Sequence, residues 1–290
     1  MINIPLKKLE SGFTMPAFGI GTWKMGGDDH RNPENNDSLD IQAIRNAIDA
    51  GITHIDTAER YADGFAEKFV GEAIQGHRRN KLFIVSKVWK THLKYDDVLK
   101  ACEGSLRRIK TDYLDLYLIH MPDPKVPIAE TMRAMDRLKK EGLIRNIGVS
   151  DFTKDRMIKA QAATRNKIVA TQVHYNLIFR EPERAGVLNY CQKNDVMLIA
   201  WRPVQQGALT KSGIQILDLM GKKYKKTPAQ IAINWLISQQ NVVTLVKMRS
   251  RKNLEENLEA IGWTLDREDV ERLRTEFPDQ KDISNAVPLQ

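Results

Sequence analysis

Short apolar runs alternate along the chain with longer segments of helical period. The apolar runs are rich in β-branched residues and are apolar almost throughout, which is typical of parallel strands covered by helices rather than of strands with one wet face. This pattern predicts eight strands, at Phe18–Gly21, His54–Asp56, Leu82–Ser86, Leu114–Ile119, Ile147–Val149, Val169–Val173, Val196–Ala200 and Val242–Val246.

The segments between these runs read as amphipathic helices. The first carries apolar residues at helical spacing and stops at Gly51, a residue that favours a helix end. A later one begins with Thr227-Pro228-Ala229-Gln230, in which threonine is a cap, proline takes the first helical position and glutamine can close a capping box. The predicted helices are Ser38–Ala50, Phe65–Ile74, Val98–Ile109, Ile128–Lys140, Glu183–Lys193, Ala229–Ser238 and Lys252–Ile261.

Eight strand–helix units imply a parallel sheet, either closed as a barrel or open and doubly wound. An open dinucleotide-binding sheet usually carries GxGxxG after its first strand, and Gly19-Ile20-Gly21-Thr22-Trp23-Lys24 does not match it. The 290 residues suit a barrel, which needs about 250, and no linker or repeat divides them. We therefore predict an α/β fold, a (β/α)8 TIM barrel with a short N-terminal β-hairpin, as one domain over residues 1–290.

Composition narrows the class of protein. Apolar residues make up 42% of the chain, yet no run approaches the roughly 20 residues that span a bilayer. The N-terminus lacks the pattern of a secretory signal, so we expect a cytoplasmic protein that does not associate with a membrane. Cys102 and Cys191 show no CxxC spacing, which argues against a disulfide framework and against a cysteine-based zinc site.

The net charge of +8 leaves two interpretations open. It could serve an anionic partner, such as a nucleic acid or a phosphorylated small molecule, or it could be a basic surface that keeps the protein soluble. Lysine and arginine are spread along the chain, and no aromatic-studded basic stretch resembles a nucleic-acid platform, so we expect no nucleic-acid partner. The densest basic run, Lys247–Lys252, follows the last strand.

Four ionisable residues lie at or just beyond the ends of three successive predicted strands. In a barrel such positions converge on the C-terminal mouth, where active sites form. Singly, each residue has an ordinary explanation as a cap, a loop residue, a solvent-facing lysine or a buried histidine. Together they fit carbonyl reduction by hydride transfer, which needs a proton and stabilisation of the charge that develops on oxygen. The four residues are Asp56, Tyr61, Lys87 and His120.

Each of these residues has a role in that chemistry. Tyr61 can donate the proton, and a neighbouring ammonium at Lys87 would lower its pKa of about 10. Asp56 would hold Lys87 in place, and His120 would hydrogen-bond the substrate oxygen. The set contains no nucleophile–base pair for acyl transfer and no evident metal site.

Long motifs around these residues closely resemble the aldo-keto reductases, in particular the short-looped microbial members. They are Gly19-Ile20-Gly21-Thr22-Trp23, Asp56-Thr57-Ala58-Glu59-Arg60-Tyr61, Val85-Ser86-Lys87-Val88-Trp89, Asp112–His120 and Gly142–Ser150. The resemblance extends in order from about Phe18 to Trp263. It implies the closed barrel and a catalytic tetrad of Asp56, Tyr61, Lys87 and His120.

The resemblance also implies NADPH as the cofactor, with NADH as a weaker alternative, held across the barrel mouth without a Rossmann domain. Four cations at the start of the last barrel helix, with Ser250 as its cap, suit a 2′-phosphate. The family usually has Asn where this chain has Asp151, commonly has Tyr-Ser-Pro-Leu where it has Trp201-Arg202-Pro203-Val204, and often has Arg at Asn253. The implied cofactor residues are Gly21, Thr22, Trp23, Asp56, Ser150, Asp151, Gln172, Trp201, Pro203, Val204, Gln205, Lys247, Met248, Arg249, Ser250, Asn253 and Asn257.

The substrate is less defined than the reaction. Trp23, Trp89, His120 and Met121 are expected to line its pocket, and the short loop after His120 suggests an open site for small, polar or sugar-derived carbonyl compounds. Two other functions stay open, a barrel that binds NADPH as a sensor and acts on a partner protein, and a nucleic-acid-binding protein suggested only by the charge. Monomers are common in the family, and the sequence leaves the choice between a monomer and an oligomer open.

Overall fold

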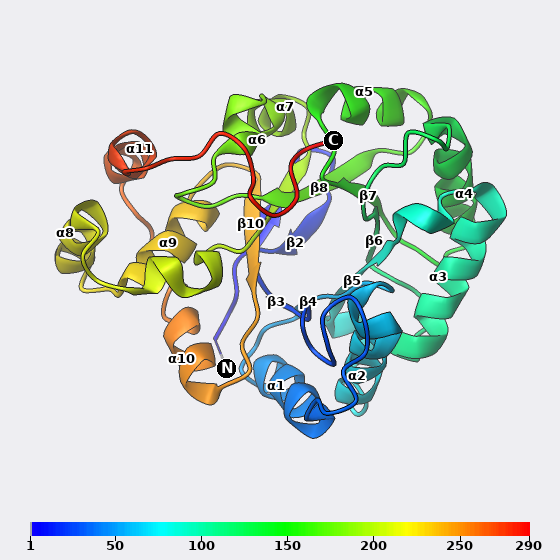
Figure 1. The fold of residues 1–290 in the computed structure, drawn as a ribbon, viewed down its shortest axis with the longest axis horizontal. Coiled ribbons are helices and arrows are strands. Elements are labelled where there is room, and N and C mark those ends of the chain that lie inside the picture. The colour runs from blue at the N-terminus through cyan, green and yellow to red at the C-terminus, as the bar shows by residue number, and fades with distance from the viewer. Residues whose placement is uncertain (1) are drawn as a thin grey trace.

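Eight parallel strands close into a barrel in the computed structural model, which describes residues 2–290 (Figure 1). Each strand pairs with the next strand of the barrel along the chain, and the last pairs with the first. The predicted fold class is confirmed. The barrel strands are β3 (Phe18–Gly21), β4 (His54–Asp56), β5 (Phe83–Val88), β6 (Leu116–Ile119), β7 (Ile147–Ser150), β8 (Ile168–His174), β9 (Met197–Trp201) and β10 (Val242–Val246).

Helices surround the barrel, and α1 to α5 follow one another along its outside from blue to green in Figure 1. The predicted helix at 183–193 is wrong as one element, because Gly186, at φ 72°, separates two shorter helices. Three polar helices that bury few side chains, α5, α8 and α11, were not predicted. The helices are α1 (Asp37–Asp49), α2 (Phe65–Ala73), α3 (Tyr95–Ile109), α4 (Ile128–Lys140), α5 (Lys154–Ala162), α6 (Glu181–Arg184), α7 (Val187–Lys193), α8 (Gln215–Tyr224), α9 (Pro228–Ile237), α10 (Arg251–Leu258) and α11 (Arg267–Glu276).

The predicted N-terminal hairpin is present and closes one end of the barrel. Its strands β1 (Leu6–Lys8) and β2 (Thr14–Pro16) are antiparallel. The hairpin's Leu9, Phe13 and Met15 are buried against the side chains that fill the barrel interior. A second and larger apolar layer lies between the barrel and its helices. Because the hairpin covers the N-terminal end of the barrel, polar side chains can gather at the opposite, C-terminal end.

Strand register brings those polar side chains to one mouth. Asp56 ends β4 and lies opposite Val85, two residues before Lys87 on β5. Ser150, the last residue of β7, lies opposite Gln172 on β8. Because all eight strands run in the same direction, every strand end reaches this mouth.

Within residues 2–290, no helix is long and apolar enough to cross a membrane.

The tail after α11 runs back over the barrel and ends near α5 (Figure 1). Two bonds fix its end, since Gln290 donates its backbone N–H to the carbonyl of Asp151 at 2.9 Å and accepts from the N–H of Thr153 at 2.9 Å. The buried Glu181 on α6 holds the tail further back by accepting from the N–H of Ser284 at 2.9 Å. The tail therefore lies beside the C-terminal end of β7.

Candidate active site

A buried lysine organises the mouth of the barrel. Lys87 has no exposed side-chain surface, and its ammonium donates to Asp56 Oδ1 at 2.6 Å, to the carbonyl of Thr57 at 2.8 Å and to Tyr61 Oη at 3.2 Å. Three oxygen acceptors thus use all three of its protons. The structure brings Asp56, Lys87 and Tyr61 together as the sequence pattern predicted.

The carboxylate of Asp56 is fixed from a second side. Gln172 Nε2, on the far side of the barrel interior, donates to Asp56 Oδ2 at 2.8 Å. The backbone N–H and the hydroxyl of Thr22 both donate to the Asp56 carbonyl at 3.0 Å. A buried carboxylate is stable only when its oxygens are paired, and here both are. Gln172 thus helps to fix Asp56 beside Lys87.

Tyr61 begins a tight turn, η1 (Tyr61–Gly64), in which three successive residues have left-handed backbone angles. Ala62, at φ 49°, donates its N–H to the carbonyl of Asp28 at 2.8 Å, and Asp63, at φ 53°, donates to that of Asp29 at 3.1 Å. Left-handed angles in residues other than glycine cost of order 1–2 kcal/mol each, so these bonds must hold the turn against strain. The turn fixes the direction in which Tyr61 projects.

The protonation states follow from burial and from the neighbouring charges. Burial acts to lower the pKa of Lys87, but Asp56 and Tyr61 outweigh it and raise the pKa above its usual value, so the ammonium persists. Burial raises the pKa of Tyr61, although Lys87 acts in the opposite direction. Lys87 acts in the expected direction, but the loss of solvation raises the pKa of Tyr61 by more than one ammonium lowers it, so the net shift is upward. Tyr61 stays a phenol at neutral pH, as a proton donor must.

His120 lies on the other side of Tyr61. Its ring meets the Tyr61 ring edge-on at 5.6 Å between centroids and the Trp89 ring at 5.0 Å. Burial, with Lys87 and Arg60 nearby, lowers the pKa of His120 well below its usual value, so the imidazole is neutral. Its Nδ1 has no partner among residues 2–290. A neutral imidazole beside the phenol can donate one hydrogen bond to a substrate oxygen.

Three of the residues expected to line the substrate pocket, Trp23, Trp89 and Met121, are each partly exposed. Trp89 meets the His120 ring, and its backbone N–H donates to Glu59 at 2.6 Å. Met121 follows His120 directly in the chain. Aromatic and apolar side chains therefore lie next to the ionisable groups.

The start of α10 forms the basic end of the expected cofactor site. Ser250 caps the helix by accepting from the N–H of Asn253 at 3.2 Å, as predicted. Burial, and to a smaller extent the nearby Arg249 and Lys24, lowers the pKa of Lys247, while Asp40 and Asp28 act to raise it. Asn253 is exposed beside it, and Asn257 is buried one turn further on. This end of the site favours an anion.

Two residues of the basic run differ from the expectation. Met248 packs its side chain in the apolar layer and is only 1% exposed, so only its backbone can face a ligand. Arg249 is already paired, with Nε 2.5 Å from Asp40 Oδ1 and Nη2 2.9 Å from Oδ2. Since Asp40 is completely buried, this pair links α10 to α1, and Arg249 is the less available cation for a phosphate.

Trp201 is partly exposed at the end of β9. Its indole stacks on the imidazole of His174 at 4.3 Å with an angle of 7° between the rings. His174 is held in turn by Gln205, whose Oε1 lies 2.8 Å from its Nε2. Pro203 is buried and Val204 half-buried in the loop between Trp201 and Gln205. The exposed part of the indole is an aromatic surface on which a flat ring can stack.

The sequence analysis missed Arg202. Its guanidinium lies 4.8 Å from the Trp23 ring centroid and 5.2 Å from that of Trp201. No carboxylate among the described residues forms an ion pair with it, and its polar neighbour is the neutral amide of Gln206. A signal was present, because Arg202 stands where the resemblance leads one to expect serine. This half-buried, unpaired cation adds to the positive charge of the mouth.

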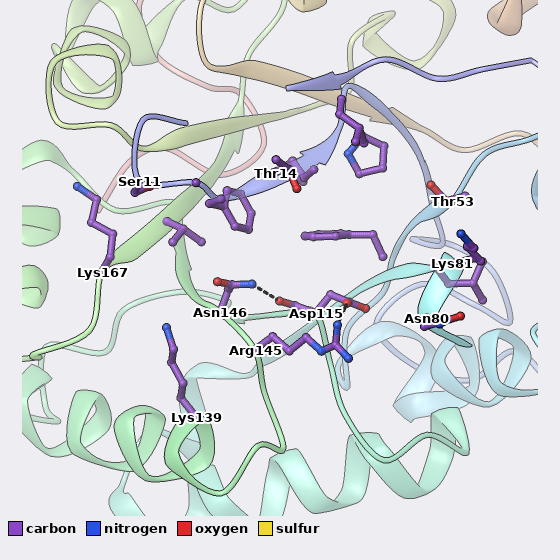
Figure 2. Close-up of a pocket in the computed structure, with 18 residues that line it drawn as sticks. Ser11, Thr14, Thr53, Asn80, Lys81, Asp115, Lys139, Arg145, Asn146 and Lys167 are labelled. Carbon is purple, nitrogen blue, oxygen red and sulfur yellow. Dashed lines mark hydrogen bonds and ion pairs between the residues drawn. The ribbon is translucent and has the colours of Figure 1, made fainter. Parts of the chain in front are cut away.

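A separate cavity of about 580 Å³ lies at the opposite end of the barrel, under the N-terminal hairpin (Figure 2). Figure 2 shows Lys139, Arg145 and Lys167 around it and the bond from Asn146 to the Asp115 carbonyl. None of the predicted site residues lines it.

Within residues 2–290, no group of three or more histidine, cysteine, aspartate or glutamate side chains could hold a metal ion.

Comparison with known proteins gives a consistent match. A model of the Aldo/keto reductase family matches residues 17–275. The chain is 35% identical to methylglyoxal reductase YeaE of Escherichia coli, over 92% of this chain and 93% of that protein. It is 34% identical to glyoxal reductase of Bacillus subtilis, over 92% and 90% of the two chains.

Solved structures match as well. The thermostable aldo-keto reductase Tm1743, in complex with the inhibitor epalrestat, superimposes with a TM-score of 0.90 at 41% identity, over 94% of this chain and 99% of that one. An aldo/keto reductase from Klebsiella pneumoniae, in complex with NADP and acetate, gives a TM-score of 0.83 at 32% identity over the full length of both chains.

Proposed function

Because this chain belongs to the aldo/keto reductase family, we propose that it reduces aldehydes or ketones to alcohols with NADPH, using Tyr61 as the proton donor. The observation that carries the proposal is the contact of the buried Lys87 ammonium with both Asp56 and Tyr61. NADPH, when bound, supplies the hydride to the carbonyl carbon. The protein's own residues must then bind the carbonyl, orient it and deliver the proton.

Each residue of the set has a distinct part in that work. As the carbonyl oxygen gains negative charge, the hydroxyl of Tyr61 donates its proton to it, and Lys87 stabilises the phenolate that remains. Asp56 keeps Lys87 charged and fixed at 2.6 Å. The neutral imidazole of His120 hydrogen-bonds the same oxygen and aligns it toward Tyr61. Such preorganised donors commonly contribute several kcal/mol to the stabilisation of a transition state.

The residues present also fit the cofactor. Asp151 Oδ1 is a buried oxygen without a partner among residues 2–290 and can accept from an amide N–H. Trp201 offers a partly exposed aromatic ring for stacking, and Ser150 on β7 lies opposite Gln172 on β8. Lys247 and the capped start of α10 would receive a phosphate. This set supports a nicotinamide at the tetrad and the phosphate of NADPH at α10.

Small reactive dicarbonyl compounds are the substrate class we favour. Two of the relatives are named as a methylglyoxal reductase and a glyoxal reductase. The partly exposed walls formed by Trp23, Trp89 and Met121 would admit such small carbonyls. Cys102 and Cys191 are buried and unpaired, which favours a reducing compartment, and we place the enzyme in the cytoplasm.

The direct test follows NADPH oxidation by its near-ultraviolet absorbance with methylglyoxal, glyoxal and 4-nitrobenzaldehyde. NADH is run in parallel. We expect turnover with NADPH and slower turnover with NADH. If the protein binds NADPH but reduces none of a broad carbonyl panel, the sensor function becomes the better explanation.

The choice of NADPH over NADH is expected to depend on Lys247. Replacing Lys247 by alanine removes a partly buried cation that has Arg249 and Lys24 as positively charged neighbours. We expect the Kd for NADPH to rise about tenfold and that for NADH to change little, since one charge-assisted hydrogen bond contributes about 1.5–3 kcal/mol. Titration of the protein's tryptophan fluorescence measures both constants. Lys100→Ala, an exposed lysine on α3, is the matched control and should alter neither.

A further inference from the structure

Asp151 is a buried acid that directly follows β7, and only one of its two carboxylate oxygens accepts a hydrogen bond. The residue is 4% exposed and has a left-handed backbone, at φ 57°. Its Oδ2 accepts from the hydroxyl of Ser150 at 3.1 Å, and its Oδ1 has no partner within hydrogen-bonding distance among residues 2–290, although the nearby indole N–H of Trp201 acts to lower the pKa of the carboxyl. A buried acceptor without a partner costs about 1–3 kcal/mol, which a ligand that donates to it would recover.

Short bonds place Asp151 next to the catalytic residues. Its backbone N–H donates to the carbonyl of Gln172 at 2.9 Å. The Gln172 side chain donates to Asp56, and Asp56 binds Lys87. Its charge also bears on Tyr61, where it acts to raise the pKa. Asp151 is therefore part of the same floor from which the proton is delivered.

The chemistry of reduction brings the reactive ring of the cofactor to this floor. Hydride goes to the carbonyl carbon while the proton goes to the oxygen bonded to it, so the ring must lie within a few ångströms of a carbonyl that contacts Tyr61. The oxidised ring carries a positive charge, and the reduced ring carries none. A carboxylate beside the ring therefore interacts differently with the two forms, whereas the neutral amide of asparagine accepts the same hydrogen bond without that difference.

We propose that Asp151 binds the nicotinamide through its free Oδ1 and, when ionised, favours the oxidised cofactor over the reduced one. The inference rests on the NADPH-dependent function proposed above. It adds a residue that sets how tightly the enzyme binds NADP+ relative to NADPH. An enzyme so built holds NADP+ more tightly as its carboxylate ionises, which promotes alcohol oxidation and slows NADP+ release after reduction.

The surroundings of Asp151 put its ionisation near physiological pH. Burial raises its pKa to about 8, while Ser150, Trp201 and Lys87 act to lower it and Glu181 on α6 acts to raise it. Lys87 and Tyr61 both have raised pKa values and do not titrate in this range. The tail contributes a backbone contact, in which Gln290 donates to the Asp151 carbonyl.

The sign of the pH effect follows from these charges. Below about pH 8 the free enzyme holds Asp151 protonated, and binding of NADP+ must expel that proton to gain the attraction. Above that pH the carboxylate is already ionised, so NADP+ binds without proton release. The affinity for NADP+ therefore rises with pH until the carboxylate is ionised, and it rises more than the affinity for NADPH, which gains only the stronger hydrogen bond to the ionised oxygen. Both nucleotides carry the 2′-phosphate, so its titration affects both Kd values equally and cancels in the ratio of the two Kd values.

The experiment compares wild type with Asp151→Asn, which keeps the shape and the acceptor oxygen. Calorimetry gives the Kd of NADP+ and of NADPH at about pH 6.5 and about pH 9.5. We expect the preference of wild type for NADP+ over NADPH to increase about tenfold or more between these two pH values, and that of Asp151→Asn to stay constant. Titrations in two buffers of different ionisation enthalpy should show that wild type releases more protons on binding NADP+ than on binding NADPH near neutral pH.

Three outcomes would overturn part or all of this account. If wild type shows no pH-dependent preference and no proton release, or if Asp151→Asn keeps both, the inference about Asp151 fails while NADPH binding leaves the proposed function intact. If wild type binds neither nucleotide, the proposed function itself fails and takes the inference with it. Should Asp151→Asn not fold, the proton release of wild type alone decides, since it needs no variant.

Discussion

Tyr61→Phe is expected to lower kcat for aldehyde reduction about a thousandfold and to leave the Kd for NADPH unchanged. The phenol is the only group in our mechanism that donates the proton, and general acid catalysis is worth about 10²–10⁴ in rate. The hydroxyl accepts from Lys87 at 3.2 Å, while Lys87 keeps Asp56 and the Thr57 carbonyl as partners. The variant should therefore fold and bind the cofactor. Steady-state rates and fluorescence titration measure the two effects.

A matched control is available elsewhere in the barrel. Tyr113, near the N-terminal end, lies between the guanidinium groups of Arg79 and Arg145, and its hydroxyl has no partner among the described residues. Tyr113→Phe removes the same atom without touching the tetrad, so its kcat should match that of wild type. If Tyr61→Phe retains wild-type kcat, Tyr61 is not the proton donor and the assignment of the tetrad is wrong.

Lys87→Met should abolish measurable activity and also destabilise the fold by about 3–5 kcal/mol. The lysine side chain is fully buried, and methionine fills a similar volume without the charge. Asp56 would then be a buried carboxylate whose remaining side-chain partner is Gln172. Removing one member of a buried ion pair costs this much because the other charge stays desolvated. Denaturant unfolding monitored by circular dichroism gives the loss of stability, and the carbonyl assay gives the loss of activity.

The double variant Lys87→Met with Asp56→Asn separates the two effects. It removes the uncompensated charge as well, so we expect most of the lost stability to return while activity stays absent. A double variant as unstable as Lys87→Met would show that the cost lies in packing around Lys87 and not in the charge of Asp56. A double variant that regains activity would contradict the role of the ammonium.

Much of the fold, and the meeting of the four residues that we propose to be catalytic, could be predicted from local sequence. Continuous apolar runs mark parallel strands, and polar residues that follow them lie at strand ends. Since all parallel strands end at one mouth, the positions of Asp56, Tyr61, Lys87 and His120 along the chain already implied that they meet there, and the structure places them at that mouth. Helices that bury little, such as α5 and α11, were missed because their weak apolar periodicity gives little signal.

Only the tertiary structure decided how these residues are charged and which of them are free to act. The net pKa shift of Tyr61 is the sum of an upward effect of burial and opposing effects of neighbouring charges. The spacing of residues in the sequence does not reveal how deeply Tyr61 is buried. The pairing of Arg249 with Asp40, 209 residues away in the chain, leaves no periodic trace in the sequence. The same is true of the unpaired Oδ1 of Asp151. Sequence patterns record which face of an element is buried, whereas desolvation and long-range pairing arise only when distant segments pack together.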